Sequence, residues 1–148
     1  VLIKDIKIKG KIKVKSKNAI IHTTKSLPFL EREGIKVNKG KVILYKRVSG
    51  DFKTQENTKN ETLWKIGDVV EHKNWKPEKD ECGENKFHAC SKPYFCNDFR
   101  NNQRDKYIAI EIFVKDLFEW KDNPKYLHKI AFRKGKVLFE CNKLGKKI

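Results

Sequence analysis

The residues best suited to chemistry are three cysteines and a histidine close together in the sequence: Cys82, His88, Cys90 and Cys96. Thiolate sulfur and imidazole nitrogen are ligands of tetrahedral zinc, so these residues predict a structural zinc site. A strand over residues 86–90 would project His88 and Cys90 from one face, with Cys82 on the preceding loop and Cys96 on the following helix. The stretch contains no Cys-x-x-Cys or His-x-x-x-His pair. Two alternatives therefore stay open: a disulfide in an exported chain, or reduced cysteines that pack as small hydrophobic side chains.

A second candidate site is a series of lysines near the amino end, at successive odd positions: Lys7, Lys9, Lys11, Lys13, Lys15 and Lys17. Aliphatic residues occupy the even positions 6, 8, 12 and 14, and this alternation predicts a strand with all six lysines on one face. Lysines on one face recur every ~6.6 Å, a spacing comparable to that of the phosphates along one nucleic-acid strand. We therefore predict a phosphate-binding surface. A solvated edge strand that resists aggregation, or contact with an anionic membrane surface, are the alternatives.

The composition favours an anionic partner for the whole chain. The 148 residues include 35 basic and 19 acidic side chains, a net charge of +16. Only five of the basic residues are arginines, and lysine attracts phosphate without fixing its geometry, so the pattern argues against readout of a base sequence. No apolar stretch is long enough for a membrane-spanning helix, and no signal peptide is visible. The start at Val1 and the absence of methionine suggest a piece cut from a longer chain.

The elements that must position these residues are mostly strands. We expect an α+β fold: a mostly antiparallel sheet of seven or eight strands with two or three short helices. Residues 1–22 form a basic strand segment, and residues 23–148 form a single α+β domain. The clearest strands are residues 41–48, 86–90 and 107–114, and residues 129–133 and 136–141 are expected to pair as a hairpin around Lys134-Gly135. Short helices are expected after Ser26 and Ser91 and at 116–120, and residues 49–60 are expected to form a loop or lid.

The stretch Asn85-Lys86-Phe87-His88-Ala89-Cys90, followed by Ser91-Lys92-Pro93, resembles a group of uncharacterised phage and prophage proteins. Members of this group carry a Gly-Phe-His-Ala-Cys signature and then a short helix with a proline. The resemblance covers about residues 41–141, and here Asn85-Lys86 replaces the usual glycine. It implies a phage origin, and hence the cytoplasm of the host cell, rather than a particular reaction.

The order of elements also resembles the ADP-ribosyltransferase fold, whose members bind NAD between two small sheets. Carried over to this chain, the resemblance implies that Arg47 holds a phosphate of NAD and that His88-Ala89-Cys90 occupies the middle motif, with Cys90 where a serine is usual. Glu140 would then orient the nucleophile. The alternative is that Arg47 and Glu140 are ordinary charges on the surface of their strands.

Three functions follow from these patterns. The first is a basic protein, stapled by zinc, that binds nucleic acid or another polyanion through Lys7 to Lys17, with Tyr45, Trp64 or Trp75 as a stacking face. The second is an enzyme: a transferase that uses NAD through Arg47, His88 and Glu140, or a nuclease toxin that acts on RNA or DNA. The third is a structural protein of a phage or host-takeover complex whose basic face meets an acidic protein. We adopt the first as the working hypothesis.

Overall fold

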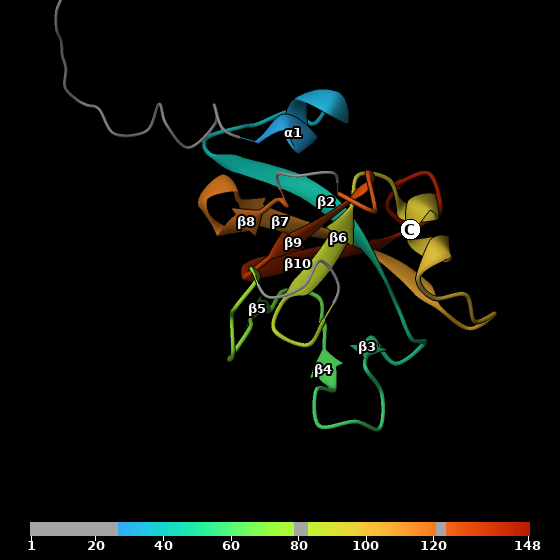
Figure 1. The fold of residues 1–148 in the computed structure, drawn as a ribbon. Coiled ribbons are helices and arrows are strands. Elements are labelled where there is room, and N and C mark those ends of the chain that lie inside the picture. Colours follow the sequence, from blue (N-terminus) through green and yellow to red (C-terminus); the bar gives the residue numbers. More distant parts are fainter. Residues whose placement is uncertain (1–26, 79–82, 121–123) are drawn as a thin grey trace, which may run out of the picture.

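The computed structural model describes residues 27–78, 83–120 and 124–148, and its main feature is one curled antiparallel sheet (Figure 1). Seven strands lie in the order β5-β10-β7-β2-β6-β9-β8, and β3 and β4 form a separate pair. The expectation of a mostly antiparallel fold with few helices is thereby confirmed. The elements are α1 (Pro28–Arg32), β2 (Lys41–Val48), β3 (Lys53–Thr54), β4 (Thr62–Leu63), β5 (Val69–Glu71), β6 (Phe87–Cys90), the 3₁₀ helix η2 (Pro93–Asp98), β7 (Lys106–Phe113), the 3₁₀ turn η3 (Val114–Asp116), β8 (Leu117–Phe118), β9 (Lys129–Phe132) and β10 (Lys134–Cys141).

The centre of the sheet is the long pair of β2 and β7, both of which were predicted from their alternating apolar residues. Val42 and Leu44 lie opposite Ile112 and Ile110, and all four side chains are buried on one face. The other strands, α1 and the loop before β5 add Phe29, Trp64, Phe87, Phe132 and Val137 to this core. A single core of aliphatic and aromatic side chains therefore holds the strands of the sheet together.

Arg133, between β9 and β10, joins the two ends of the sheet. Its guanidinium donates to Asp116, immediately before edge strand β8, with Nη2 2.8 Å from Oδ1, and to Glu71 on the opposite edge strand β5, with Nη1 2.5 Å from Oε2. Its backbone N–H also donates to the Asp116 carbonyl, at 2.9 Å. The sheet is thus curled until its edge strands approach each other, which limits the unpaired backbone that they expose.

The predicted hairpin of the last two strands is wrong. β9 pairs with β6 and β8, whereas β10 pairs with β5 and β7. At Arg133 the chain therefore crosses from the side of the sheet that contains β6, β9 and β8 to the side that contains β5, β10 and β7, instead of turning back. Gly135 permits this crossing, since a Cβ atom there would lie 2.6 Å from the Ile110 side chain. A Lys-Gly pair between two apolar runs has the pattern of a turn, but here the glycine allows two strands to approach closely.

Other predictions differ in detail. The helical turn expected at 116–120 lies earlier, as η3, and is followed by strand β8. Residues 49–60 are part of an ordered excursion that contains β3 and leads to β4, and it carries Trp64 into the core. The lysine-rich strand, the basic segment 1–22 and Cys82 fall outside the described residues. No helix in the described ranges is long and apolar enough to cross a membrane.

Candidate functional site

Lys46 places a positive charge on the core face of β2. Val42, Leu44 and Val48 share that face and are buried, so Lys46 is the exception in an otherwise apolar row. β2 and β6 pair only at Tyr45 and Cys90, and beyond this point the Lys46 Nζ donates a hydrogen bond to the His88 carbonyl at 2.7 Å. Its ammonium also lies 5.2 Å from the centre of the Trp64 ring. The amine therefore occupies the gap that opens where the two strands separate.

The electrostatic surroundings of this amine are unfavourable to its charge. Burial lowers the pKa of Lys46 to about 8. The thiols of Cys96 and Cys90 act to raise this pKa, whereas the positive charges of Lys129 and Arg100 act to lower it. Among the described residues no carboxylate lies within ion-pair distance of Lys46. An anion bound beside Lys46 would remove this electrostatic cost.

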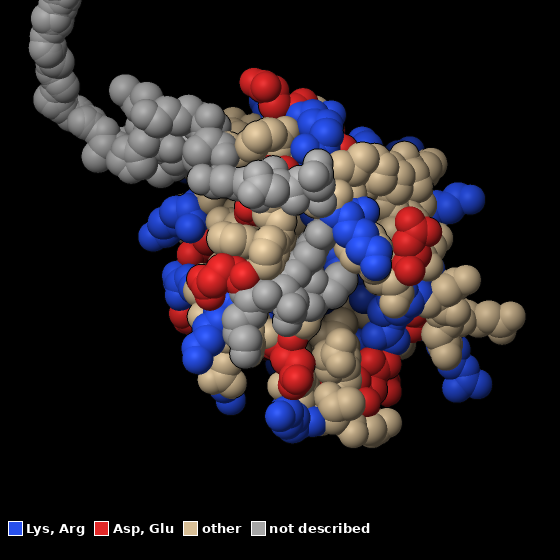
Figure 2. Space-filling view, in the orientation of Figure 1, with Lys and Arg blue, Asp and Glu red and all other residues tan. Residues whose placement is uncertain are grey.

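A cavity of about 380 Å³ opens above Lys46 and adjoins a second of about 630 Å³ that shares several of its lining residues. We call the first of these the basic cleft. Among the described residues, four basic side chains and one glutamate line it, together with two of the three cysteines of the predicted zinc site and one phenylalanine ring: Lys46, Arg47, Arg100, Lys129, Glu56, Cys90, Cys96 and Phe99. Figure 2 shows basic side chains gathered to the right of the centre of this face, below the uncharged surface over η2. The cleft is of a size and charge to accept an anionic group.

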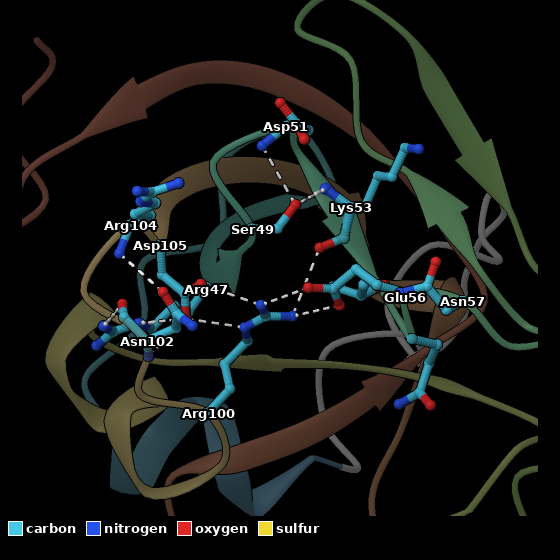
Figure 3. A network of polar contacts seen from close by, with 12 residues as sticks. Arg47, Ser49, Asp51, Lys53, Glu56, Asn57, Arg100, Asn102, Arg104 and Asp105 are labelled. Carbon is cyan, nitrogen blue, oxygen red and sulfur yellow. Dashed lines mark hydrogen bonds and ion pairs between the residues drawn. The ribbon is translucent and has the colours of Figure 1, made fainter.

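Two of these basic side chains belong to an ion-pair network around Asp105 (Figure 3). The Arg47 and Arg100 Nε atoms lie 3.0 and 2.9 Å from Asp105 Oδ2, and Arg100 also makes a two-pronged contact with Glu56, at 2.9 and 2.8 Å. Burial alone would raise the pKa of Asp105, but hydrogen bonds from Arg100 and the Asn102 amide outweigh it and lower the pKa. Glu56 lies on the excursion and Arg100 just after η2, so the network fixes one wall of the cleft to the other.

The thiols of Cys90 and Cys96 are buried together under the cleft. A hydrogen bond from Cys90 lowers the pKa of Cys96, further aided by the charge of Lys46, and the same contact raises the pKa of Cys90. Cys141 lies apart on β10, where burial raises its pKa to about 11. None of these three cysteines is in a disulfide.

The structure thus brings two of the four predicted zinc ligands together. Cys90 and Cys96 are in contact, and His88 lines the same cleft from β6. Within residues 27–78, 83–120 and 124–148, no group of three His, Cys, Asp or Glu side chains is arranged to hold a metal ion. Because Cys82 lies outside these ranges, the four-ligand zinc site stays a prediction.

The residues of the transferase hypothesis do not share one site. Arg47 lies opposite Tyr107 and Glu140 opposite Ile108 in the strand pairing, and neighbouring positions of β7 face opposite sides of the sheet. Arg47 is also engaged with Asp105 and, through its Nη1, with Tyr107 at 3.1 Å. His88 lies on β6, beside β2. Arg47 and His88 both line the basic cleft, whereas Glu140 does not.

Several residues of the cleft were missed by the sequence analysis. Lys46 had a signal, because Val42, Leu44 and Val48 alternate along residues 41–48 and position 46 falls on the same face of the strand. Phe99, Arg100 and Lys129 had none, since they come together only through the pairing of β6 with β9 and the packing of η2. Trp64, predicted as a stacking face, is instead fully buried, and its Nε1 donates to Thr54 Oγ1 at 2.9 Å.

No known family model matches the chain, and no similar curated protein or solved structure was found. The resemblances to phage proteins and to ADP-ribosyltransferases therefore stay predictions.

Proposed function

We propose that this protein binds nucleic acid through its phosphates, with Lys7 to Lys17 as one contact surface and the basic cleft as another. The observation that carries the proposal is Lys46, a half-buried ammonium group in a cleft, close to Lys129 and Arg100 and without a carboxylate partner among the described residues. Placing a charge on the core face of a strand lowers stability unless something compensates for it. A phosphate in the cleft would provide that compensation.

The kind of positive charge supports phosphate contacts over base readout. Lys46 presents a point charge, whereas the guanidinium groups of Arg47 and Arg100 are held by Asp105 and Glu56. Arginine forks that are held by carboxylates are not available to read guanine edges. We therefore expect affinity that depends strongly on salt and little on base sequence.

We also propose that a structural zinc ion stabilises this site. Cys90 and Cys96 supply two adjacent sulfur ligands, and His88 and Cys82 would complete the set. A metal there would tie β6 to η2, and so would hold the wall of the cleft that carries the thiols.

The experiment is a titration of labelled single-stranded oligonucleotide, followed by fluorescence anisotropy at several salt concentrations. Each phosphate contact on a single strand contributes about −0.7 to the slope of log K against log salt, so replacing the six odd lysines from Lys7 to Lys17 by glutamine should flatten the slope by about 4. The control variant carries six glutamines at lysines exposed elsewhere: Lys36, Lys65, Lys76, Lys115, Lys136 and Lys143. Equal slopes for the two variants would contradict the assignment of the contact surface.

A further inference from the structure

Aromatic side chains gather beside the basic cleft, where η2 packs against the segment before β9. Tyr94 and Phe95 lie 4.8 Å apart between ring centres, Phe95 stacks on His128 at 3.8 Å, and Phe99 meets Tyr126 edge to face at 5.1 Å. We call these five residues the ring cluster. Two of its rings are turned to solvent, since Tyr94 and Phe99 are each 41% exposed.

The ring cluster is joined to the cleft through Lys129. The ammonium of Lys129 lies 4.4 Å from the centre of the Phe99 ring and 4.3 Å from that of Tyr126, and Phe99 and Lys129 both line the basic cleft. Lys125 lies over Tyr126, at 5.5 Å. Phe99 and Tyr126 thus contact an ammonium group that lines the basic cleft together with Lys46.

One acidic side chain beside this cluster, Glu33, is covered by its hydrogen-bond partners. Glu33 accepts hydrogen bonds from Ser91, with an oxygen–oxygen distance of 2.5 Å, and pairs with His128 Nδ1 at 2.8 Å. Its carboxylate is almost completely covered by these neighbours.

We infer that the ring cluster is a stacking platform for the unpaired bases of single-stranded nucleic acid whose phosphates bind in the basic cleft. The inference rests on the proposed function and names its substrate class. A nucleotide offers a flat aromatic face and an anionic phosphate side by side, which is the complement of Phe99 beside Lys129 and Lys46. In a duplex the base faces are stacked on one another, so only unpaired bases can lie on these rings.

The test compares three labelled probes of equal length by fluorescence anisotropy: a thymidine oligomer, an abasic oligomer with the same phosphates, and a duplex. We expect the thymidine oligomer to bind about tenfold more tightly than the abasic one, and Phe99→Ala to remove most of this difference. Phe99→Ala should change binding of the abasic oligomer less than about twofold, because the phosphate contacts remain.

Phe113 provides a matched control. It is 42% exposed, and Lys41 and Lys115 lie over its ring at 5.2 and 5.6 Å, but its partner Lys41 is five residues from Lys46, about 16 Å along β2. Phe113→Ala should leave binding of all three probes unchanged. A second measurement uses the wild-type protein and so does not depend on the folding of a variant. The thymidine oligomer should shift the NMR signals of the Phe99 and Tyr94 ring protons, and the abasic oligomer should not.

Two failures can be told apart. If the thymidine and abasic oligomers bind equally and salt still weakens both, the platform is wrong and phosphate binding stands. If none of the probes binds at low salt, the proposed function fails and the platform fails with it.

Discussion

Replacing Lys46 by methionine should abolish a specific part of the pH dependence of stability. Lys46 has an ordinary pKa of 10.5 and a pKa of about 8 in the folded protein, because burial disfavours its charged form. Between these two values the unfolded chain holds a proton that the folded protein has released. The free energy of unfolding therefore rises with pH over this interval, and the cost of the buried charge is present in full only below about pH 8.

The size of the effect follows from the two pKa values. A group with pKa 10.5 when unfolded and about 8 when folded raises the free energy of unfolding by about 1.4 kcal/mol between pH 7 and pH 9. Other groups titrate in this range: the pKa of the Cys141 thiol is raised to about 11 by burial, for example, which lowers stability as pH rises above 9. The difference between wild type and Lys46→Met cancels such contributions and isolates Lys46.

The assay is urea unfolding followed by tryptophan fluorescence at pH 7 and pH 9, in buffer with a chelator. Relative to Lys46→Met, the wild type should gain about 1.4 kcal/mol between the two pH values. Lys41→Met serves as the control, because Lys41 lies on the same strand but pairs with Glu111 near solvent, at 3.7 Å. Identical pH dependence in wild type and Lys46→Met would refute the placement of this amine in the core face.

Two further predictions concern the walls of the cleft. Asp105→Asn leaves Arg47 and Arg100 without their shared carboxylate and should lower the free energy of unfolding by about 3 kcal/mol in chemical denaturation. Glu61→Gln, which breaks an exposed pair with Lys53, should have a much smaller effect on the free energy of unfolding. Equal effects of the two substitutions would count against the network. Protein purified without chelator should contain close to one zinc per chain by elemental analysis, and the double substitution of Cys90 and Cys96 by serine should remove it. A wild-type zinc content near zero would eliminate the staple.

The sequence was sufficient for the elements with strong local patterns. Alternating apolar residues located β2 and β7, and the strand expected at residues 86–90 and the short helix expected after Ser91 are found as β6 and η2. The same alternation marks Lys46, because it falls on the face of the strand that carries Val42, Leu44 and Val48. A charge at a buried position of a strand was therefore a usable signal for the site.

The remainder of the site depends on pairing between distant segments, which a local pattern does not encode. The crossing at Arg133 depends on the curl of the whole sheet, and a Lys-Gly pair there has the same local pattern as a hairpin turn. Likewise, Phe99 and Tyr126 meet only because β6 pairs with β9 and brings the segment before β9 against η2. Long-range contacts of this kind decide where the cations and rings gather.

The most direct test of phosphate binding in the cleft is the salt dependence of single-strand affinity in the double variant Lys46→Gln, Lys129→Gln. Two lost phosphate contacts should reduce the slope of log K against log salt by about 1.4 relative to wild type. Lys65 and Lys76 replaced by glutamine, two exposed lysines that do not line the cleft, give the same change in net charge and should leave the slope unaltered. A slope that is the same in wild type and in the Lys46 and Lys129 double variant would contradict the account.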